Sequence, residues 1–242
     1  VICVPTPLKD DQTPDLGAVS GAAGDIALRL RAGMLVVLES TTYPGTTDGL
    51  LREILETSGL TAGTDFALAF SPERIDPGNP TYQLRNTPKV VGGYTAACTE
   101  RAVELYSQLV DVVVPVSGTR EAEMSKLLEN TYRHVNIALV NEIAVFSHDL
   151  GIDVWESLRA ASTKPFGFTA FYPGPGVGGH CIPIDPNYLS HSVRSLGYQF
   201  KFVELAQDVS NRMPAYVVTR VQGQLNEMEK PVKNSKVLVL GL

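Results

Sequence analysis

A glycine- and proline-rich stretch holds the strongest candidate for a reactive group. It reads Phe171-Tyr-Pro-Gly-Pro-Gly-Val-Gly-Gly-His-Cys-Ile-Pro-Ile-Asp185. Glycines let backbone amides approach a ligand closely, and such a turn presents the Cys181 thiol rather than burying it. A thiolate there could act as a nucleophile. Cys3 and Cys98 fall in a predicted strand and helix, where a cysteine is usually a small buried side chain.

A lysine and an amide lie one helical turn apart earlier in the chain. The sequence predicts a helix over 119–150, and one face of it carries Lys126, Asn130, His134, Ile137 and Asn141. The pair could stabilise an anionic or oxyanionic group. The spacing alone favours an ordinary solvated face, since exposed polar stripes are the normal case on a helix.

Two further candidates follow predicted strands. Glu73 lies in the segment SPERIDPGN after the strand 66–70, and Thr41 follows the strand 34–38. Ligands of α/β proteins bind at the carboxyl ends of parallel strands, so Glu73 is a candidate acid or base. The alternative for residues 71–79 is a simple turn. The alternative for the hydroxyls of Ser40, Thr41 and Thr42 is a cap of the next helix.

Other chemistry finds less support. The chain contains no Walker A, GxSxG, HExxH or GxGxxG pattern, and we expect no metal site. A cysteine hydrolase would need His134, His148 or His191 within hydrogen-bond reach of Cys181. His180 is a poor partner because adjacent side chains point apart.

Alternating short strands and helices must position these residues. This alternation indicates a parallel sheet covered on both faces over 1–117. From Thr119 the chain is helical, with acids near the start of the long helix and a capping-box-like start at Asp153. The predicted strands are 1–4, 34–38, 66–70, 90–91, 112–116 and 236–240; the predicted helices are 16–30, 47–55, 95–109, 119–150, one from Asp153, 185–196 and 211–228.

Composition excludes several classes of protein. The chain has 242 residues, 44% hydrophobic, with a net charge of −6. This excludes extensive disorder and argues against nucleic-acid and anionic-membrane partners. Three cysteines without a CxxC pair make a disulfide framework improbable and favour the cytoplasm.

Five segments together resemble the nucleotide-sugar 6-dehydrogenases, the family of UDP-glucose, UDP-N-acetylglucosamine and UDP-N-acetylmannosamine dehydrogenases. They are VICVPTPL, SPERIDPGN, EMSKLLENTYRHVNIALVNE, PGPGVGGHCIPIDP and KVLVLGL. They occur in the family's order along essentially the whole chain.

The resemblance implies oxidation of a sugar C6 hydroxyl to a carboxylate with two NAD+ in succession. Cys181 falls at the catalytic cysteine, which traps the aldehyde as a thiohemiacetal and then carries a thioester that water hydrolyses. Lys126 and Asn130 match residues that stabilise oxyanionic intermediates.

The resemblance also assigns roles to the remaining candidates. Thr41 matches a hydroxyl that orients the catalytic water, Glu73 a carboxylate of base catalysis and hydrolysis, and Asp185 an acid that supports the water and Lys126. The implied NAD contacts are Pro5, Thr6, Thr41 and Glu73. The implied substrate contacts are Glu73, Lys126, Asn130, Phe171, Tyr172 and Gly178.

One departure bears on the substrate. UDP-glucose enzymes typically carry a second glutamate four residues after the first, where this sequence has Pro77. The segments ERIDPGN and TKPFGFTAFYPGPGVGGHCIP resemble the UDP-N-acetylhexosamine branch. We therefore expect UDP-N-acetylglucosamine, ahead of UDP-N-acetylmannosamine and UDP-glucose, with residues 164–176 lining the sugar.

The family architecture implies an α/β fold with three parts. We expect 1–117 to be the carboxyl-terminal half of a Rossmann-like NAD-binding domain. Residues 118–229 would form an all-helical central domain with a long helix that makes a homodimer. Residues 230–242 would be a linker and the first strand of a second Rossmann-like domain that binds UDP.

The first residue is Val rather than Met, and the cofactor glycine loop would precede it. We therefore expect a partial chain that turns over little by itself, in a cytoplasmic enzyme of polysaccharide biosynthesis. The alternative is a non-catalytic, dimerising helical module.

Overall fold

The structure is a computed structural model that describes residues 1–9, 13–76, 78–179 and 185–240. The chain divides into two compact units. Unit 1 comprises Val1–Tyr132 and Gly179–Phe200, and unit 2 comprises Arg133–Gly178 and Lys201–Leu242.

Unit 1 is built on a four-stranded sheet in the order β1-β2-β3-β4. The pairs β1–β2 and β3–β4 are parallel, with Leu38 opposite Phe70 and Val91 opposite Pro115. The strands are β1 (Leu35–Leu38), β2 (Ala67–Phe70), β3 (Lys89–Gly93) and β4 (Val113–Pro115). The prediction of a sheet domain in the first half of the chain is confirmed.

The sheet departs from an all-parallel arrangement in one pair. β2 and β3 are antiparallel, with Ala69 opposite Gly93. A parallel connection requires a crossover of a dozen or more residues, usually a helix, and the described residues between Phe70 and Lys89 form no helix. The predicted strand 1–4 is reduced to a single parallel bridge between Ile2 and Leu38.

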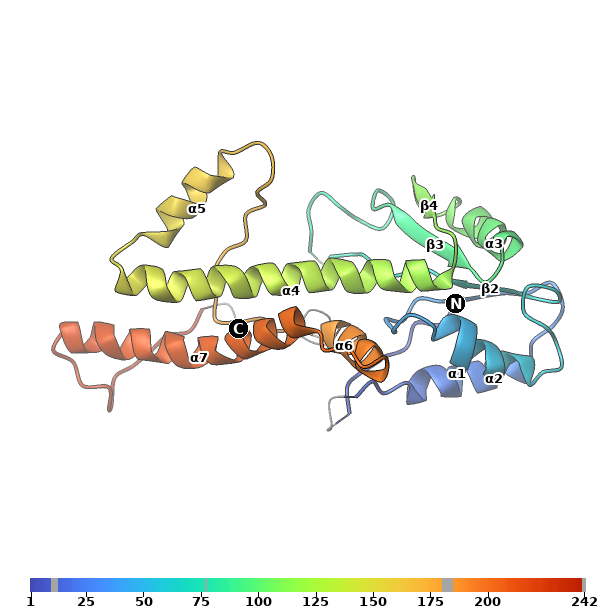
Figure 1. The fold of residues 1–242 in the computed structure, drawn as a ribbon, viewed down its shortest axis with the longest axis horizontal. Coiled ribbons are helices and arrows are strands. Elements are labelled where there is room, and N and C mark those ends of the chain that lie inside the picture. The colour runs from blue at the N-terminus through green and yellow to red at the C-terminus, as the bar shows by residue number, and fades with distance from the viewer. Residues whose placement is uncertain (10–12, 77, 180–184, 241–242) are drawn as a thin grey trace. The chain divides into compact units, whose positions relative to one another are not determined.

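Helices cover both faces of this sheet (Figure 1), with α1 (Gly17–Ala27) and α2 (Arg52–Glu56) on one face and α3 (Ala96–Tyr106) on the other. A π-helical turn, η1 (Thr47–Leu51), leads into α2. Strand residues alternate between two apolar clusters: Leu38 and Phe70 pack with Val19 of α1, while Val37 and Ala69 pack beside α3. Burial on both faces explains why the strands are continuous apolar runs.

Two further helices complete unit 1. The long helix α4 (Thr119–Asp149) contributes its first half, and α6 (Asp185–Ser195) packs against it through Leu127, Tyr188 and Leu189. Both helices begin where the sequence predicts. One of the acids near the start of α4, Glu123, is fully buried instead of facing solvent at the end of the helix.

Unit 2 contains the rest of α4 with α5 (Val154–Ser162) and α7 (Lys201–Glu227). Asp153 caps α5 as predicted, because its side chain accepts hydrogen bonds from the amides of Trp155 and Glu156 at 2.9 and 3.2 Å. α7 begins ten residues before the predicted start at Asn211. Proline normally occurs in the first turn of a helix, but Pro214 lies inside α7.

Pro214 leaves the carbonyl of Ser210 without the amide donor that residue 214 would supply in a regular helix. Gly176, with φ +112°, lies so close that an added Cβ would be 2.8 Å from this carbonyl oxygen. Only glycine fits both the conformation and the space.

Residues 236–240 form no strand. A strand needs a neighbour to accept its ladder hydrogen bonds, and none pairs with this segment in the described part of the chain. None of the helices over the described residues is long and apolar enough to cross a membrane.

Candidate active site

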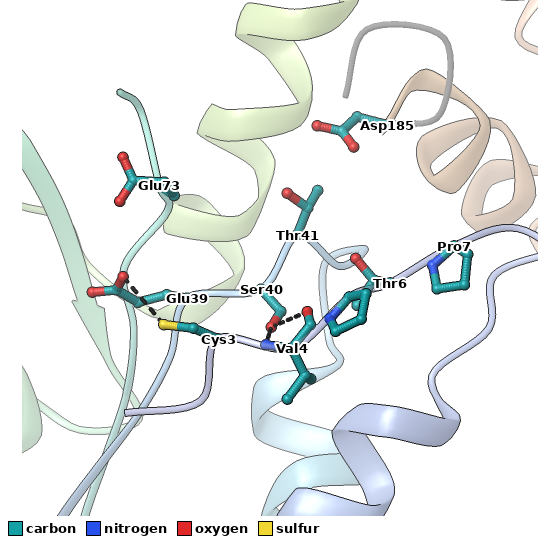
Figure 2. Close-up of a pocket in the computed structure, with 10 residues that line it drawn as sticks. Cys3, Val4, Thr6, Pro7, Glu39, Ser40, Thr41, Glu73 and Asp185 are labelled. Carbon is teal, nitrogen blue, oxygen red and sulfur yellow. Dashed lines mark hydrogen bonds between the residues drawn. The ribbon is translucent and has the colours of Figure 1, made fainter. Parts of the chain in front are cut away.

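A cavity of about 540 Å³ opens at one edge of the sheet in unit 1 (Figure 2). Three sides of the cavity are formed by the segments that follow Ile2, β1 and β2. The fourth side is formed by Asp185, the first residue of α6. Ile2, β1 and β2 run parallel to one another, so their carboxyl ends meet at this edge, where α/β proteins bind ligands. The lining residues are Cys3, Val4, Pro5, Thr6, Pro7, Glu39, Ser40, Thr41, Glu73 and Asp185.

Two side chains fix the first wall, which contains Pro5 and Thr6. The buried Ser40 hydroxyl accepts a hydrogen bond from the Val4 amide and donates one to the Val4 carbonyl, each at 2.8 Å. The Tyr188 hydroxyl donates to the carbonyls of Thr6 and Pro7 at 2.9 and 3.2 Å. The wall is thus held both by the segment that follows β1 and by α6.

The wall at Thr41 continues into a loop that is fixed by a buried carboxylate. Glu123 of α4 accepts hydrogen bonds from the amides of Gly45 and Thr47 at 2.7 and 2.9 Å. The hydroxyls of Thr47 and Thr42 donate to it at 2.7 and 3.4 Å. Burial raises the pKa of Glu123 to about 7, although these hydrogen bonds lower it.

Glu73 follows β2, and its loop is fastened to α4. Lys126 Nζ donates to the backbone carbonyl of Glu73 at 2.5 Å. The next residue, Arg74, pairs with Glu129 at 2.7 Å and donates to the Pro88 carbonyl at 2.7 Å. These contacts hold the backbone of Glu73 while its carboxylate lines the cavity.

Asp185 lies on the opposite side of the cavity from Glu73 (Figure 2) and is 3% exposed. Asn130 Nδ2 donates to its Oδ2 at 2.5 Å. Burial raises the pKa of Asp185 to about 6, although the charge of Lys126 and the hydrogen bond from Asn130 both lower it. An acid with this pKa can exchange a proton near neutral pH.

Most of the predicted site residues therefore belong to one place. Pro5, Thr6, Thr41, Glu73 and Asp185 line the cavity, and Lys126 and Asn130 contact two of them. Three predicted substrate contacts, Phe171, Tyr172 and Gly178, belong to unit 2, where Tyr172 stacks on Trp155 with ring centroids 6.2 Å apart. Cys181, His180 and Pro77 lie outside the described residues.

The histidines proposed for a cysteine hydrolase have other surroundings. His134 is fully buried, and its ring nitrogens have no hydrogen-bond partner among the described residues. His148 contacts Arg220, and His191 lies 6.1 Å from the Tyr43 ring. Over the same residues, no group of three or more His, Cys, Asp or Glu side chains could hold a metal ion.

Sequence reasoning missed a polar cluster behind the cavity. Lys89 Nζ lies 3.2 Å from Glu39 Oε1 and 3.5 Å from Glu73 Oε2. Tyr106 donates its hydroxyl to Glu39 Oε1, and Cys3 Sγ donates to Oε2 at 3.7 Å. The only available signal was a charged residue directly beside each of two apolar strands, Glu39 after 34–38 and Lys89 before 90–91.

Sequence models of one family match both parts of the chain. The NAD binding domain of the UDP-glucose/GDP-mannose dehydrogenase family matches residues 1–110, and its central domain matches residues 120–212. These boundaries place the cavity walls that follow Ile2, β1 and β2 in the first domain and Asp185 in the second.

Individual relatives agree with this assignment. The chain is 37% identical to a UDP-N-acetyl-D-glucosamine 6-dehydrogenase from Pseudomonas aeruginosa, over 100% of this chain and 57% of the relative. It is 37% identical to a UDP-N-acetyl-D-mannosamine dehydrogenase from Escherichia coli K12, over 100% of this chain and 59% of the relative. The solved UDP-D-ManNAc dehydrogenase of Pyrococcus horikoshii superposes with a TM-score of 0.86 at 37% identity, covering 95% of this chain and 54% of that one.

The chain thus spans little more than half the length of these relatives. Within that span it carries an α/β sheet domain and a helical domain in the order that the two sequence models describe. The chain belongs to the UDP-glucose/GDP-mannose dehydrogenase family.

Proposed function

We propose that the protein is an NAD-dependent nucleotide-sugar 6-dehydrogenase that oxidises the C6 hydroxyl of a UDP-sugar to a carboxylate. The observation that carries this proposal is the cavity in which Thr41, Glu73 and Asp185 converge, with Lys126 and Asn130 bonded to two of them. Relatives named as nucleotide-sugar dehydrogenases support it along the whole chain.

The cavity suits one end of a dinucleotide. Its volume of about 540 Å³ lies within the range of small-molecule sites, and it lies at the carboxyl ends of parallel strands, where dinucleotides bind. Pro5, Thr6, Thr41 and Glu73 would contact the bound cofactor. When bound, NAD+ supplies a hydride acceptor for each of the two oxidations.

The chemistry requires an alcohol to lose two hydrides from the same carbon. In the first oxidation C6 loses a hydride and its hydroxyl loses a proton, which gives an aldehyde. The Cys181 thiol then adds across the C=O bond: its sulfur bonds to the carbon and its proton ends on the oxygen, which gives a thiohemiacetal. This step is needed because an aldehyde itself has no carbinol from which a second hydride can leave. Loss of that hydride and of the hydroxyl proton gives a thioester.

Water completes the reaction by attacking the thioester carbon. The carbon–sulfur bond breaks, the thiol is regenerated, and the sugar leaves as a carboxylate. Thr41 would orient the water, and Glu73 and Asp185 would accept its two protons. One of these protons would pass to the departing Cys181 sulfur, which restores the thiol, and the other would be released to solvent. The buried Asp185, with a pKa of about 6, suits proton transfer near neutral pH. Lys126 and Asn130 would stabilise the oxyanion formed at each addition.

For the substrate we propose a UDP-N-acetylhexosamine, with UDP-N-acetylglucosamine favoured. The sequence ERIDPGN supports this choice, and relatives of equal identity are named for UDP-N-acetylglucosamine and for UDP-N-acetylmannosamine. Residues 164–176 and Phe171, Tyr172 and Gly178 would contact the sugar.

We also propose the domain division 1–117 and 118–229, and a homodimer that uses the helical domain. Large apolar side chains remain exposed along α4 and α7, including Leu139, Phe146 and Val218, which supports a protein–protein contact there. A catalytic free thiol needs a reducing compartment, which supports a cytoplasmic location.

The proposal is tested with the full-length protein and UDP-N-acetylglucosamine, UDP-N-acetylmannosamine and UDP-glucose in turn. We expect two NADH for each carboxylate formed, fastest with the first sugar. Cys181→Ser should abolish carboxylate formation, whereas Cys98→Ala, which changes a buried thiol of α3, should retain it. Unchanged acid production by the Cys181 variant would overturn the mechanism. Absence of binding of both NAD+ and every UDP-sugar would favour the non-catalytic module.

A further inference from the structure

Lys89 is a buried cation beside the cavity. Its side chain is 6% exposed, and its backbone amide, at the first position of β3, donates to the Val112 carbonyl at 2.9 Å. Lysine is rarely buried unless it is paired, because removing an ammonium from water is costly. The position of Nζ is therefore set by the sheet and by its partners.

Glu39 is the first partner, and it is itself fixed. Its carboxylate is 14% exposed and lies 3.2 Å from Lys89 Nζ. The Tyr106 hydroxyl and the Cys3 thiol each donate a hydrogen bond to it, and the Tyr106 ring lies 5.2 Å from Nζ. Glu39 thus neutralises the ammonium and holds it in place.

Glu73 is the second partner and differs in exposure. Its side chain is 45% exposed, and its Oε2 lies 3.5 Å from Lys89 Nζ. Its other oxygen accepts a hydrogen bond from the Ile75 amide at 2.6 Å. Figure 2 shows the carboxylates of Glu39 and Glu73 on the same side of the cavity. Among the described residues, Lys89 is the one cation whose ion pair reaches the Glu73 carboxylate.

We propose that Lys89 is a positioning residue that holds the Glu73 carboxylate at the wall of the active-site cavity. Lys126 fixes the backbone of Glu73, and Lys89 fixes the carboxylate from the sheet. The inference rests on the proposed function, in which Glu73 faces cofactor and substrate. A base that swings freely between rotamers loses the geometric advantage of a preorganised site.

The kinetic experiment uses the full-length enzyme with NAD+ and its best UDP-sugar. Lys89→Met keeps the aliphatic stem and removes the charge. We expect kcat to fall on the order of 10-fold to 100-fold, with KM for the UDP-sugar changed by less than about threefold. Lys89→Arg should recover most of kcat. Arg85→Gln, which removes an exposed cation paired with Asp111, is the matched control and should stay near wild type.

A double-mutant cycle separates positioning from a general structural role. If Lys89 acts through Glu73, Lys89→Met should cause no further loss in a Glu73→Gln background. A full, additive loss in that background would overturn the proposal, as would wild-type kcat in Lys89→Met.

A crystal structure of full-length Lys89→Met gives a readout that does not need activity. The proposal expects the Glu73 side chain to leave the cavity wall while Glu39 stays bonded to Tyr106. An unmoved Glu73 would overturn it. If the wild-type protein oxidises no nucleotide sugar, the proposed function fails, and this structural comparison still decides the role of Lys89.

Discussion

Asn130 donates a hydrogen bond of 2.5 Å to Asp185 and so joins α4 to the first residue of α6, 55 positions later. The contact is buried at both ends, where a hydrogen bond to a charged group contributes more than one in water. It also places an acid with a raised pKa at the cavity. The contact therefore links the packing of the two helices to the protonation state of the site.

The pKa of Asp185 predicts a dependence of stability on pH. Folding raises this pKa from 3.8 to about 6, so the folded state binds more protons than the unfolded state between these values. The free energy of unfolding should therefore fall as pH rises through that window, by up to about 3 kcal/mol. Asp185→Asn should remove this fall in urea unfolding experiments at several pH values. Asp25→Asn, at an exposed position of α1, should leave it; a persisting fall in the Asp185 variant would contradict the assignment.

Glu123 predicts a second effect at higher pH. Folding raises its pKa from 4.5 to about 7, so the free energy of unfolding should fall, by up to about 3 kcal/mol, as pH rises through that range. Glu123→Gln removes the titrating group. The NH2 of the new side chain also cannot accept the hydrogen bond that the Gly45 amide donates to Glu123. We expect a loss of about 1–2 kcal/mol at pH 5 and a flatter profile up to pH 7. Glu121→Gln, at an exposed position of the same helix, is the control. A profile unchanged by the Glu123 substitution would refute this account.

Tyr188→Phe tests how the first cavity wall is held. The substitution keeps the buried ring and removes the hydroxyl that donates to the carbonyls of Thr6 and Pro7. We expect thermal unfolding to show a loss of about 1 kcal/mol, and hydrogen exchange to speed up near Thr6. Tyr198→Phe, at a side chain that is 70% exposed, should change neither; equal behaviour of the two variants would argue against the anchor.

Gly176→Ala tests the approach of the glycine-rich loop to α7. The new Cβ would lie 2.8 Å from the Ser210 carbonyl at a φ of +112°. Both the overlap and the backbone conformation are unfavourable, so we expect a loss of about 2 kcal/mol or more in denaturant unfolding. Gly174→Ala is matched, since a Cβ there has no neighbour within 4 Å and the Gly174 amide can still donate to Asn141. Similar stability of both variants would rule out the close contact.

Local spacing was sufficient to predict much of the site. Glu73 and Thr41 follow apolar strands, and parallel strands bring their carboxyl ends to one edge. Lys126 and Asn130 share a helix face because they are four residues apart. The resemblance to a family added roles to these residues, and the sequence models matched the same family.

Other features depend on contacts that spacing does not contain. Lys89 and Glu39 are 50 positions apart, and only the packing of α3 across β1, β2 and β3 shows that they form a buried pair. The described residues between β2 and β3 form no helix, so the sequence there does not decide whether the two strands pair parallel or antiparallel. The predicted start of α7 was wrong. Proline disfavours a helix interior, but α7 continues through Pro214.

The first half of α4 sets the spacing and the direction of three side chains that hold the site together. Glu123, Lys126 and Asn130 contact three separate segments, the loop before η1, the loop after β2 and the start of α6. Each residue added to an α-helix turns the later part of the helix by about 100° and advances it by about 1.5 Å. After the insertion of one residue between Glu123 and Asn130, at most two of the three side chains could still reach their partners. Exposed positions such as Leu128 can change in chemistry, whereas the length of this stretch cannot change.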